Sequence, residues 1–302
     1  MEYGTGAVKD LRDERNYEYD HLIFGEPIVD WEVGFDIEKK LKTTLPVKDQ
    51  KSSTSCVGQA WASYLYVKNW LELAKIYQEK TIEHLSELSA KAIYSQITLG
   101  YKAGARIADG GKLAKNWGAI SELIVPSQEN GLTSEDFMIN KSWWTALITE
   151  QAKVLQVKEY RIIRAEDNID MVAQTIQEND GAVIGFTGSN NSTWRNTFPK
   201  PPKPEEKTWG HALYGGKFKL INGKKHIGIL NSWGKDTGEQ GWQWIDEIYF
   251  KSGNVFNPWT LIDKPNAIKI KLLDRNGKPR ELPAFMFKAI RYLIEKRRFT
   301  LK

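Results

Sequence analysis

A single cysteine occurs in this 302-residue chain, Cys56, in the stretch "PVKDQKSSTSCVGQAWASYLY". It stands six residues after Gln50, where a long amphipathic helix is expected to begin. A thiol at a helix N-terminus can serve as a nucleophile, because the helix dipole and the free N–H groups favour its thiolate. A lone cysteine is also often just a small buried hydrophobic residue. What the rest of the chain places beside Cys56 decides between these two interpretations.

The second half of the chain carries polar groups that suit a thiol nucleophile, in "GHALYGG" and "ILNSWGKDTGEQGW". Such a nucleophile needs a base, a group that orients the base, and donors for the oxyanion. His211 begins a predicted strand and Asn231 ends its hairpin partner. The Asn-Gly turn at 222–223 makes these strands antiparallel, so both residues can reach the same end of the sheet. Gln50 can offer an amide donor beside the Cys56 N–H.

The other three histidines fit structural interpretations better. His226 lies among isoleucines on a predicted strand, which is typical of a hydrogen-bonded core histidine. His21 and His84 are expected at the surface. Asn231 could also simply cap a strand end.

Helices are predicted early in the chain and strands late. Apolar positions recur every three or four residues from Cys56 to about residue 78, which indicates a long helix. Further helices are predicted over 85–97, 110–119 and 167–180, with Ser86 and Ser89 as capping candidates for the first of these. Strands are predicted over 181–188, over a hairpin spanning 211–233, and over 241–250. Two packed lobes with a cleft between them follow from this order.

The motifs "PVKDQ", Cys56, "GHA", "NSWG" and "GEQGW" follow one another in an order that resembles the papain-like (C1) cysteine peptidase family. The resemblance runs from about Val29 to Phe250. It implies an α+β, papain-like fold, with a helical lobe at about 50–150 and an antiparallel β-barrel-like lobe at about 151–262. Residues 1–28 would be an N-terminal extension and residues 263–302 a basic C-terminal extension.

The resemblance also implies roles for individual residues. Cys56 would be the nucleophile, His211 its acid–base partner and Asn231 the group that orients the imidazole, while Gln50 completes the oxyanion hole. Other residues are expected at the substrate: Gly110 and Gly111, which resemble a glycine pair that binds an extended peptide, together with Gly210 and Trp233. Trp233 would also shield the His211–Asn231 hydrogen bond from water. Gly110 and Gly111 could instead be only a turn before a helix.

Some features depart from the family pattern. Ser53 stands where the family often has a cysteine, and its other disulfide cysteines are absent too. Cys56 and His211 are 155 residues apart, slightly beyond the usual spacing of about 130–150. Only 28 residues precede Val29, so the family's long inhibitory pro-segment is not expected.

The expected reaction is hydrolysis of a peptide bond in a polypeptide substrate through a thioester acyl-enzyme, with no metal or organic cofactor. A thiolate–imidazolium pair is expected, with the pKa of Cys56 lowered and that of His211 raised. Two alternatives remain open: a catalytically inert module within a larger assembly such as a phage particle, and a hydrolase of peptidoglycan stem peptides.

The C-terminal segment is strongly basic. Residues 264–302 carry 12 Lys or Arg against 3 Asp or Glu, which leaves a balance of −4 on the preceding 263 residues. A strand over 267–273 and an amphipathic helix over about 283–298 are predicted there. The helix could pack on the body of the protein, or the segment could dock the protein on an acidic partner.

Targeting signals are not apparent. The first 20 residues lack an apolar core, no run of about 18 apolar residues occurs, and one cysteine cannot form an intramolecular disulfide. These features predict a soluble, cytoplasmic protein without a membrane span, with a place in a virus particle as the alternative.

Overall fold

The computed structural model describes residues 4–11, 13, 29–77, 85–129, 131, 133–163 and 167–262, and the backbone of 272–273 and 279–280. The chain divides into two compact units, Met1–Lys264 and Pro265–Lys302. In the second unit, β10 (Leu272–Leu273) and β11 (Pro279–Arg280) pair antiparallel. The helix predicted over 283–298 lies outside the described residues, as do His21 and His84.

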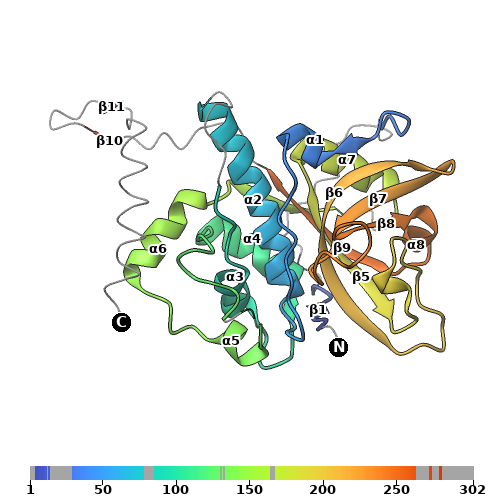
Figure 1. The fold of residues 1–302 in the computed structure, drawn as a ribbon, viewed down its shortest axis with the longest axis horizontal. Coiled ribbons are helices and arrows are strands. Elements are labelled where there is room, and N and C mark those ends of the chain that lie inside the picture. Colours follow the sequence, from blue (N-terminus) through green and yellow to red (C-terminus); the bar gives the residue numbers. More distant parts are fainter. Residues whose placement is uncertain are drawn as a thin grey trace. The chain divides into compact units, whose positions relative to one another are not determined.

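The first unit opens with helices, as the sequence predicts (Figure 1). The long predicted helix is α2 (Cys56–Tyr77), which packs against α3 (Ala90–Ile97) and α4 (Ile107–Asn116). The shorter helices are α1 (Ile37–Leu41), α5 (Glu135–Ile139), α6 (Ala146–Ala152) and the 3₁₀ turn η2 (Lys153–Leu155).

Two helix boundaries differ from the prediction. Helix α3 begins at Ala90 rather than at residue 85, because the Ser89 side chain accepts a hydrogen bond from the Ala92 N–H and caps it there. Ser86, the other capping candidate, instead bonds Ser121 through their hydroxyls. Helix α4 begins at Ile107, three residues earlier than predicted.

An antiparallel sheet forms the second half of this unit. Among the described residues its strands run in the order β4-β9-β5-β6-β7-β8, and β2 pairs with β6. The strands are β2 (Phe35–Asp36), β4 (Glu159–Ile162), β5 (Ala182–Ser189), β6 (Thr208–Ile221), β7 (Lys224–Leu230), β8 (Trp242–Asp246) and β9 (Val255–Ile262). The predicted hairpin is confirmed: Asn222 and Gly223 have φ of 52° and 73° and join β6 to β7.

The predicted strand over 241–250 is only half correct. Strand β8 ends at Asp246, whose side chain accepts a hydrogen bond from the Tyr249 N–H and starts helix α8 (Glu247–Lys251). A capping carboxylate thus overrides the alternation of large residues that favoured a longer strand.

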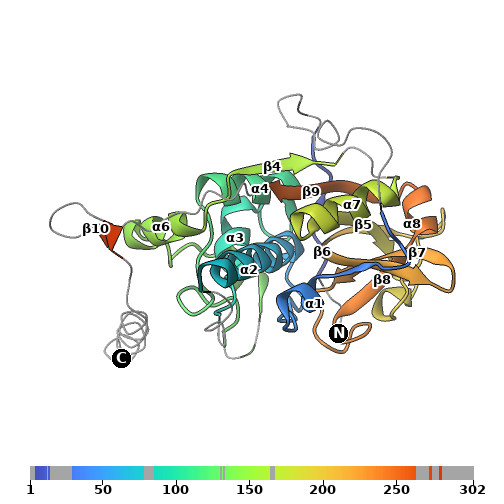
Figure 2. The same ribbon diagram turned by 90° about the horizontal axis from the view of Figure 1, so that it is seen from above.

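The sheet lies between helices on both of its faces (Figure 2). Along β6, Ala212 and Tyr214 belong to the core shared with α2, while Leu213 belongs to the core shared with α7 (Ile169–Asn179). This alternation follows from the two-residue period of a strand. The mixed α+β class expected from the sequence is confirmed.

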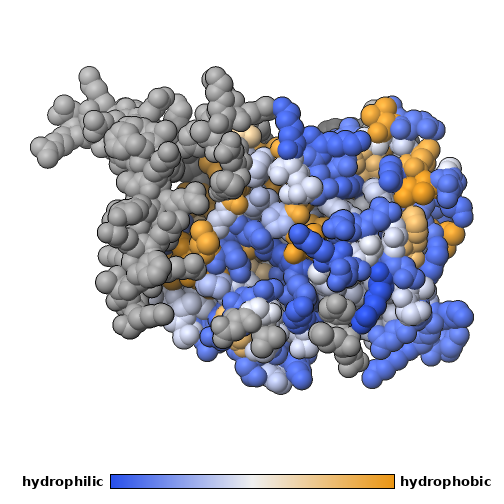
Figure 3. Space-filling view, in the orientation of Figure 1, coloured by the Kyte–Doolittle hydropathy of each residue, from blue (hydrophilic) through white to orange (hydrophobic). Residues whose placement is uncertain are grey.

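Hydrophilic residues cover most of the described surface on the face shown in Figure 3. Among the described residues, no helix combines the length and apolar character that crossing a membrane requires.

Gly110 and Gly111 lie inside α4 and are buried, so the structure does not place them on an open strand edge. A Cβ on Gly110 would come within 2.1 Å of Trp61 Cδ1, and one on Gly111 within 2.9 Å of Tyr160 Cδ2. The Trp61 indole is fixed there, since its Nε1 donates to the Ile107 carbonyl at 2.9 Å. These glycines therefore allow α4 to pack closely, and their helical backbone cannot pair with an extended peptide.

Replacing Gly110 by Ala should destabilise the protein by about 1–3 kcal/mol, the usual cost of overpacking. The loss would occur although Ala favours a helix by about 1 kcal/mol over Gly. Urea unfolding measures the effect, with Lys112→Ala on an exposed position of the same helix as the control. A Gly110→Ala protein as stable as that control would contradict the packing argument.

Candidate active site

Cys56 is the first residue of α2 and is fully buried. The loop before it is held by Gln50, whose side-chain Nε2 donates to the Ser53 carbonyl at 2.8 Å. Ser232 fixes the other end of this amide, because its hydroxyl donates to Gln50 Oε1. The Gln50 amide therefore presents its NH₂ group to the loop that leads to Cys56 and its oxygen to Ser232.

His211 lies on β6, and Asn231 follows the last residue of β7. The His211 Nε2 and Asn231 Oδ1 atoms are 3.1 Å apart. Asn231 Nδ2 donates to Gln243 Oε1 at 2.7 Å, and Gln243 Nε2 donates to the carbonyls of Trp194 and Asn196. With its own amide oriented in this way, Asn231 accepts from Nε2–H and leaves Nδ1 as the basic nitrogen of a neutral imidazole.

His211 Nδ1 is buried and has no hydrogen-bond partner among the described residues. The backbone N–H of the next residue, Ala212, points at the Cys56 sulfur. The Cys56 sulfur at the start of α2 therefore lies against β6 at the residue that follows His211.

Trp233 covers the imidazole. Its ring stacks on that of His211 with a centroid distance of 4.6 Å and an interplanar angle of 21°. Trp194 and Trp209 meet the same imidazole edge-on. The side chain predicted to shield the His211–Asn231 bond is thus in contact with the imidazole.

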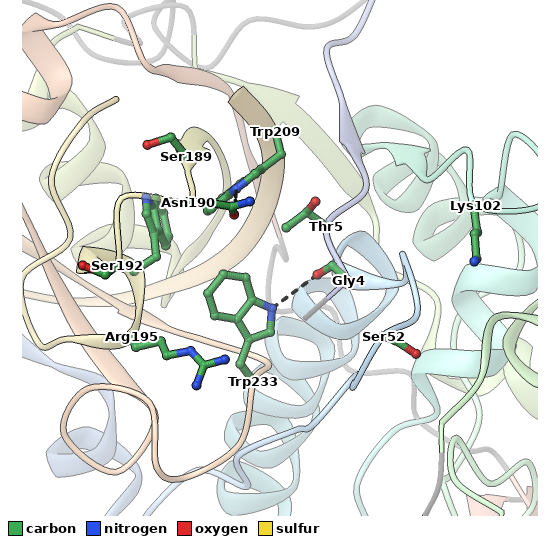
Figure 4. A pocket seen from close by; sticks show the side chains of 11 residues that line it. Gly4, Thr5, Ser52, Lys102, Ser189, Asn190, Ser192, Arg195, Trp209 and Trp233 are labelled. Atoms are coloured by element: carbon green, nitrogen blue, oxygen red, sulfur yellow. Dashed lines mark hydrogen bonds between the residues drawn. The ribbon is translucent and has the colours of Figure 1, made fainter. Parts of the chain in front are cut away.

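Residues 4–11 of the chain itself, which we call the strap, run through this site. Within it, β1 (Ala7–Val8) pairs in parallel with β3 (Ala105–Arg106). The Gly4 carbonyl accepts from Gln50 Nε2 at 3.0 Å and from Trp233 Nε1 at 3.4 Å (Figure 4). The Gly6 carbonyl accepts from the Ala105 N–H at 2.9 Å, and the Gly6 N–H points at the Cys56 sulfur.

Glycines on both sides permit this close approach. A Cβ on Gly4 would lie 1.9 Å from the Ser53 carbonyl oxygen, and one on Gly6 would lie 2.4 Å from that of Thr54. On the facing walls, a Cβ on Gly104 would meet the Gly6 carbonyl oxygen at 1.8 Å, and one on Gly210 the Ala7 carbonyl oxygen at 2.0 Å. Gly210, expected at the substrate, thus lies directly against an extended backbone in the cleft.

The far end of the strap is anchored by Asp10. Its carboxylate accepts from Trp259 Nε1 at 2.6 Å and from the Ala108 N–H, at the start of α4, at 3.2 Å. The Asp10 N–H donates to Asn257 Oδ1 at 2.8 Å. The strap is therefore held at both of its ends as well as along β3.

Burial disfavours the charged forms of both Cys56 and His211. It raises the pKa of the Cys56 thiol to about 11 and lowers the pKa of the His211 imidazole to about 4. Each shift corresponds to about 3 kcal/mol against the charged form. The ion pair expected from the sequence is therefore disfavoured in this closed state, because neither charge can be solvated.

The structure gathers most of the predicted site residues around this point: Cys56, His211, Asn231, Gln50, Trp233 and Gly210. It does not bring Gly110 and Gly111 there. His226 is separate too, with Nδ1 2.8 Å from the Lys224 carbonyl oxygen.

The sequence does not predict the role of Gln243, nor does it predict the strap or its pairing with strand β3. The only local signal for the last two is glycine placed beside small residues, in "GTGAV" and "AGAR". Among the described residues, no three His, Cys, Asp or Glu side chains gather in a way that could hold a metal ion.

Several solved structures are similar to this chain. Xylellain, a cysteine protease from Xylella fastidiosa, matches with a TM-score of 0.68 and 20% identity over 87% of this chain and 97% of its own. Procathepsin B from Trypanosoma congolense matches with a TM-score of 0.58 and 13% identity over 86% and 87%. A cysteine protease from Carica candamarcensis, in complex with E-64, matches with a TM-score of 0.55 and 16% identity over 78% and 100%.

No family model matches the sequence, and no curated protein matches it. The similarity therefore lies in the fold, which spans nearly the whole of the compared proteases. This chain has the papain-like fold.

Proposed function

We propose that this protein is a cysteine peptidase that hydrolyses peptide bonds within polypeptides. One observation carries the proposal: a peptide carbonyl, that of Gly4, already accepts a hydrogen bond from the Gln50 amide, and the N–H of Gly6, two residues on, points at the Cys56 sulfur. An oxyanion hole needs a donor at this position. The fold shared with cysteine proteases supports the same reaction.

The proposed reaction proceeds through a thioester. His211 Nδ1 takes the thiol proton, and the Cys56 sulfur attacks the substrate carbonyl carbon. Gln50 Nε2 and the Cys56 N–H, which has no partner within α2, stabilise the oxyanion. The imidazolium then gives its proton to the leaving amine, which releases the first product. Nδ1 later takes a proton from a water molecule whose oxygen attacks the thioester carbonyl carbon. The acyl group leaves as a carboxylic acid, and the released Cys56 thiolate takes the proton back from the imidazolium.

The strap would hold this enzyme in a closed resting state. It occupies the donor of Gln50, lies against the sulfur and removes the water that the ion pair needs. A substrate can reach Cys56 only when residues 4–8 leave the cleft. Opening would also solvate the two side chains, so that the Asn231 hydrogen bond, which favours the imidazolium, could raise the pKa of His211.

One buried carboxylate, that of Glu135, ties the nucleophile loop to the edge of the cleft. It accepts from the Thr54 N–H at 2.7 Å and from the Lys102 N–H at 3.2 Å. It also accepts from the hydroxyls of Thr54 and Tyr94. Thr54 lies two residues before Cys56, and Lys102 lies in the turn that leads into β3. We assign Glu135 a positioning role for the loop that leads to Cys56. This loop has Ser53 where the family often has a cysteine, so no disulfide holds it in place.

Cys56→Ala should abolish cleavage of casein and of short peptides, because no other thiol exists in the chain. Asn231→Ala should lower kcat about 10- to 100-fold and leave residual activity, since Asn231 orients the imidazole without carrying charge. Peptide cleavage followed by mass spectrometry measures both. Turnover by Cys56→Ala equal to wild type would refute the peptidase. Release of cell-wall fragments without casein cleavage would favour peptidoglycan as the substrate.

Gly6→Ala should open the strap, because the added Cβ meets the Thr54 backbone. A clash of about 1–3 kcal/mol would raise the open fraction about 5- to 150-fold. The rate of Cys56 alkylation by iodoacetamide should rise accordingly. At pH 6 the variant should react while wild type stays slow, since the closed thiol has a pKa of about 11.

Leu11→Ala is the matched control, because this strap side chain is 72% exposed and should not affect docking. Equal alkylation rates for wild type and Gly6→Ala would contradict closure by the strap.

Glu135→Gln should lower the unfolding free energy by about 1.5–3 kcal/mol, since an amide cannot satisfy donors on both of its sides. In a Gly6→Ala background it should also lower kcat about tenfold, because the Thr54 loop positions the nucleophile. Glu122→Gln is the control: its carboxylate bonds Ser127 away from the cleft. If Glu135→Gln and Glu122→Gln gave the same kcat in the Gly6→Ala background, the role of Glu135 would be purely structural.

A further inference from the structure

Gln243 is a polar side chain buried in the sheet behind the catalytic pair. It lies on β8 and is fully shielded from solvent. A buried amide is costly unless its polar groups find partners. The Oε1 atom of Gln243 accepts from Asn231 Nδ2 at 2.7 Å. Its Nε2 atom donates to the carbonyls of Trp194 and Asn196, at 2.9 and 2.8 Å. Both ends of this amide therefore have partners within the protein.

The two carbonyls that Gln243 bonds belong to a firmly held segment. Four successive carbonyls, those of residues 194–197 around the end of the 3₁₀ turn η3 (Thr193–Arg195), accept hydrogen bonds from β8 or from the turn before it. The second accepts from the Gly238 N–H at 3.1 Å, and the fourth accepts from the Trp244 N–H at 2.8 Å. A main-chain oxygen can only accept. These carbonyls therefore fix which end of the Gln243 amide faces them.

The direction of these bonds extends from Gln243 to the imidazole. Because both N–H groups of Gln243 Nε2 face carbonyls, its Oε1 must face Asn231. Only the NH₂ group of Asn231 can bond that oxygen, so its Oδ1 must face His211 Nε2, which is 3.1 Å away. An acceptor at this distance requires a proton on Nε2. The neutral ring then keeps Nδ1 free to act as a base.

We propose that Gln243 is a positioning residue that acts through Asn231 to hold His211 in the Nε2–H tautomer. Without Gln243 the Asn231 amide could turn over and donate to Nε2, because one of its ends would be unpaired in either orientation. The ring would then carry its proton on Nδ1, the atom that must accept the thiol proton in the proposed reaction. The effect on catalysis rests on the proposed peptidase function, but the choice of tautomer does not.

Nuclear magnetic resonance of the full-length protein, with ¹⁵N in its histidine rings, tests the proposal without a substrate. At pH 7 the His211 imidazole is neutral, because burial lowers its pKa to about 4. The chemical shift distinguishes a ring nitrogen that carries a proton from one that does not, and His211→Gln identifies the resonances. Wild type should show only the Nε2–H tautomer, whereas Gln243→Leu should show a substantial fraction of the Nδ1–H tautomer.

Two variants control for a general loss of structure. Gln243→Glu should keep the Nε2–H tautomer, because burial favours the neutral acid, which can donate to one carbonyl and still accept from Asn231. Thr175→Val removes a buried hydrogen bond to the Met171 carbonyl within α7 and should keep it too.

A Gln243→Leu protein with only the wild-type tautomer would overturn the proposal, as would an equal change of tautomer in Thr175→Val. Gln243→Met, whose side chain has a similar length, allows the same comparison if Gln243→Leu does not fold.

Kinetics in the Gly6→Ala background test whether Gln243 acts through Asn231. Gln243→Leu should lower kcat about tenfold with little change in KM, because it shifts part of the ring to the inactive tautomer. The double variant Gln243→Leu/Asn231→Ala should be no slower than Asn231→Ala alone. Losses that multiply in the double variant would contradict the proposal. A change of tautomer in a protein that cleaves no peptide would refute the peptidase and leave the role of Gln243 standing.

Discussion

The hydrogen bond from the Gln50 amide to the Gly4 carbonyl is the interaction on which the rest of the cleft depends. It can form because Ser232 and the Ser53 carbonyl fix both ends of the Gln50 side chain. It brings the strap so close to the loop before Cys56 that only glycine fits at positions 4 and 6. The remaining contacts of the strap, with β3 and through Asp10, hold the rest of this segment in the position that the hydrogen bond sets.

Burial determines the charge of Cys56 and His211 in this structure. Burial disfavours both the Cys56 thiolate and the His211 imidazolium. The Asn231 hydrogen bond favours the imidazolium, but desolvation outweighs it while the strap is in place. Access of water, rather than a rearrangement of the catalytic groups, would therefore separate the resting state from the proposed active one.

Local signals made part of the site predictable. An Asn-Gly turn fixes the hairpin that brings His211 and Asn231 together, and Gln50 is close to Cys56 in the sequence. Gly110 and Gly111 were misplaced, because "DGG" resembles a turn and their role depends on Trp61 and Tyr160, which lie far away in the sequence. The strap has no periodic pattern, since β1 spans two residues and its partner strand lies almost a hundred positions away. Such long-range pairing leaves no local trace that sequence reasoning could use.

The strap covers one part of the cleft and leaves another part open, and this difference bears on how a substrate would enter. A tethered strap competes at an effective concentration on the order of millimolar, so a dilute peptide that used only the strap's own contacts would rarely displace it. A pocket of about 520 Å³ beside the strap, lined by the indole rings of Trp194, Trp209 and Trp233, offers further contacts. A substrate held there would itself be tethered next to the strap and would compete with it on nearly equal terms. In the proposed enzyme, binding in this pocket would therefore precede exposure of Cys56.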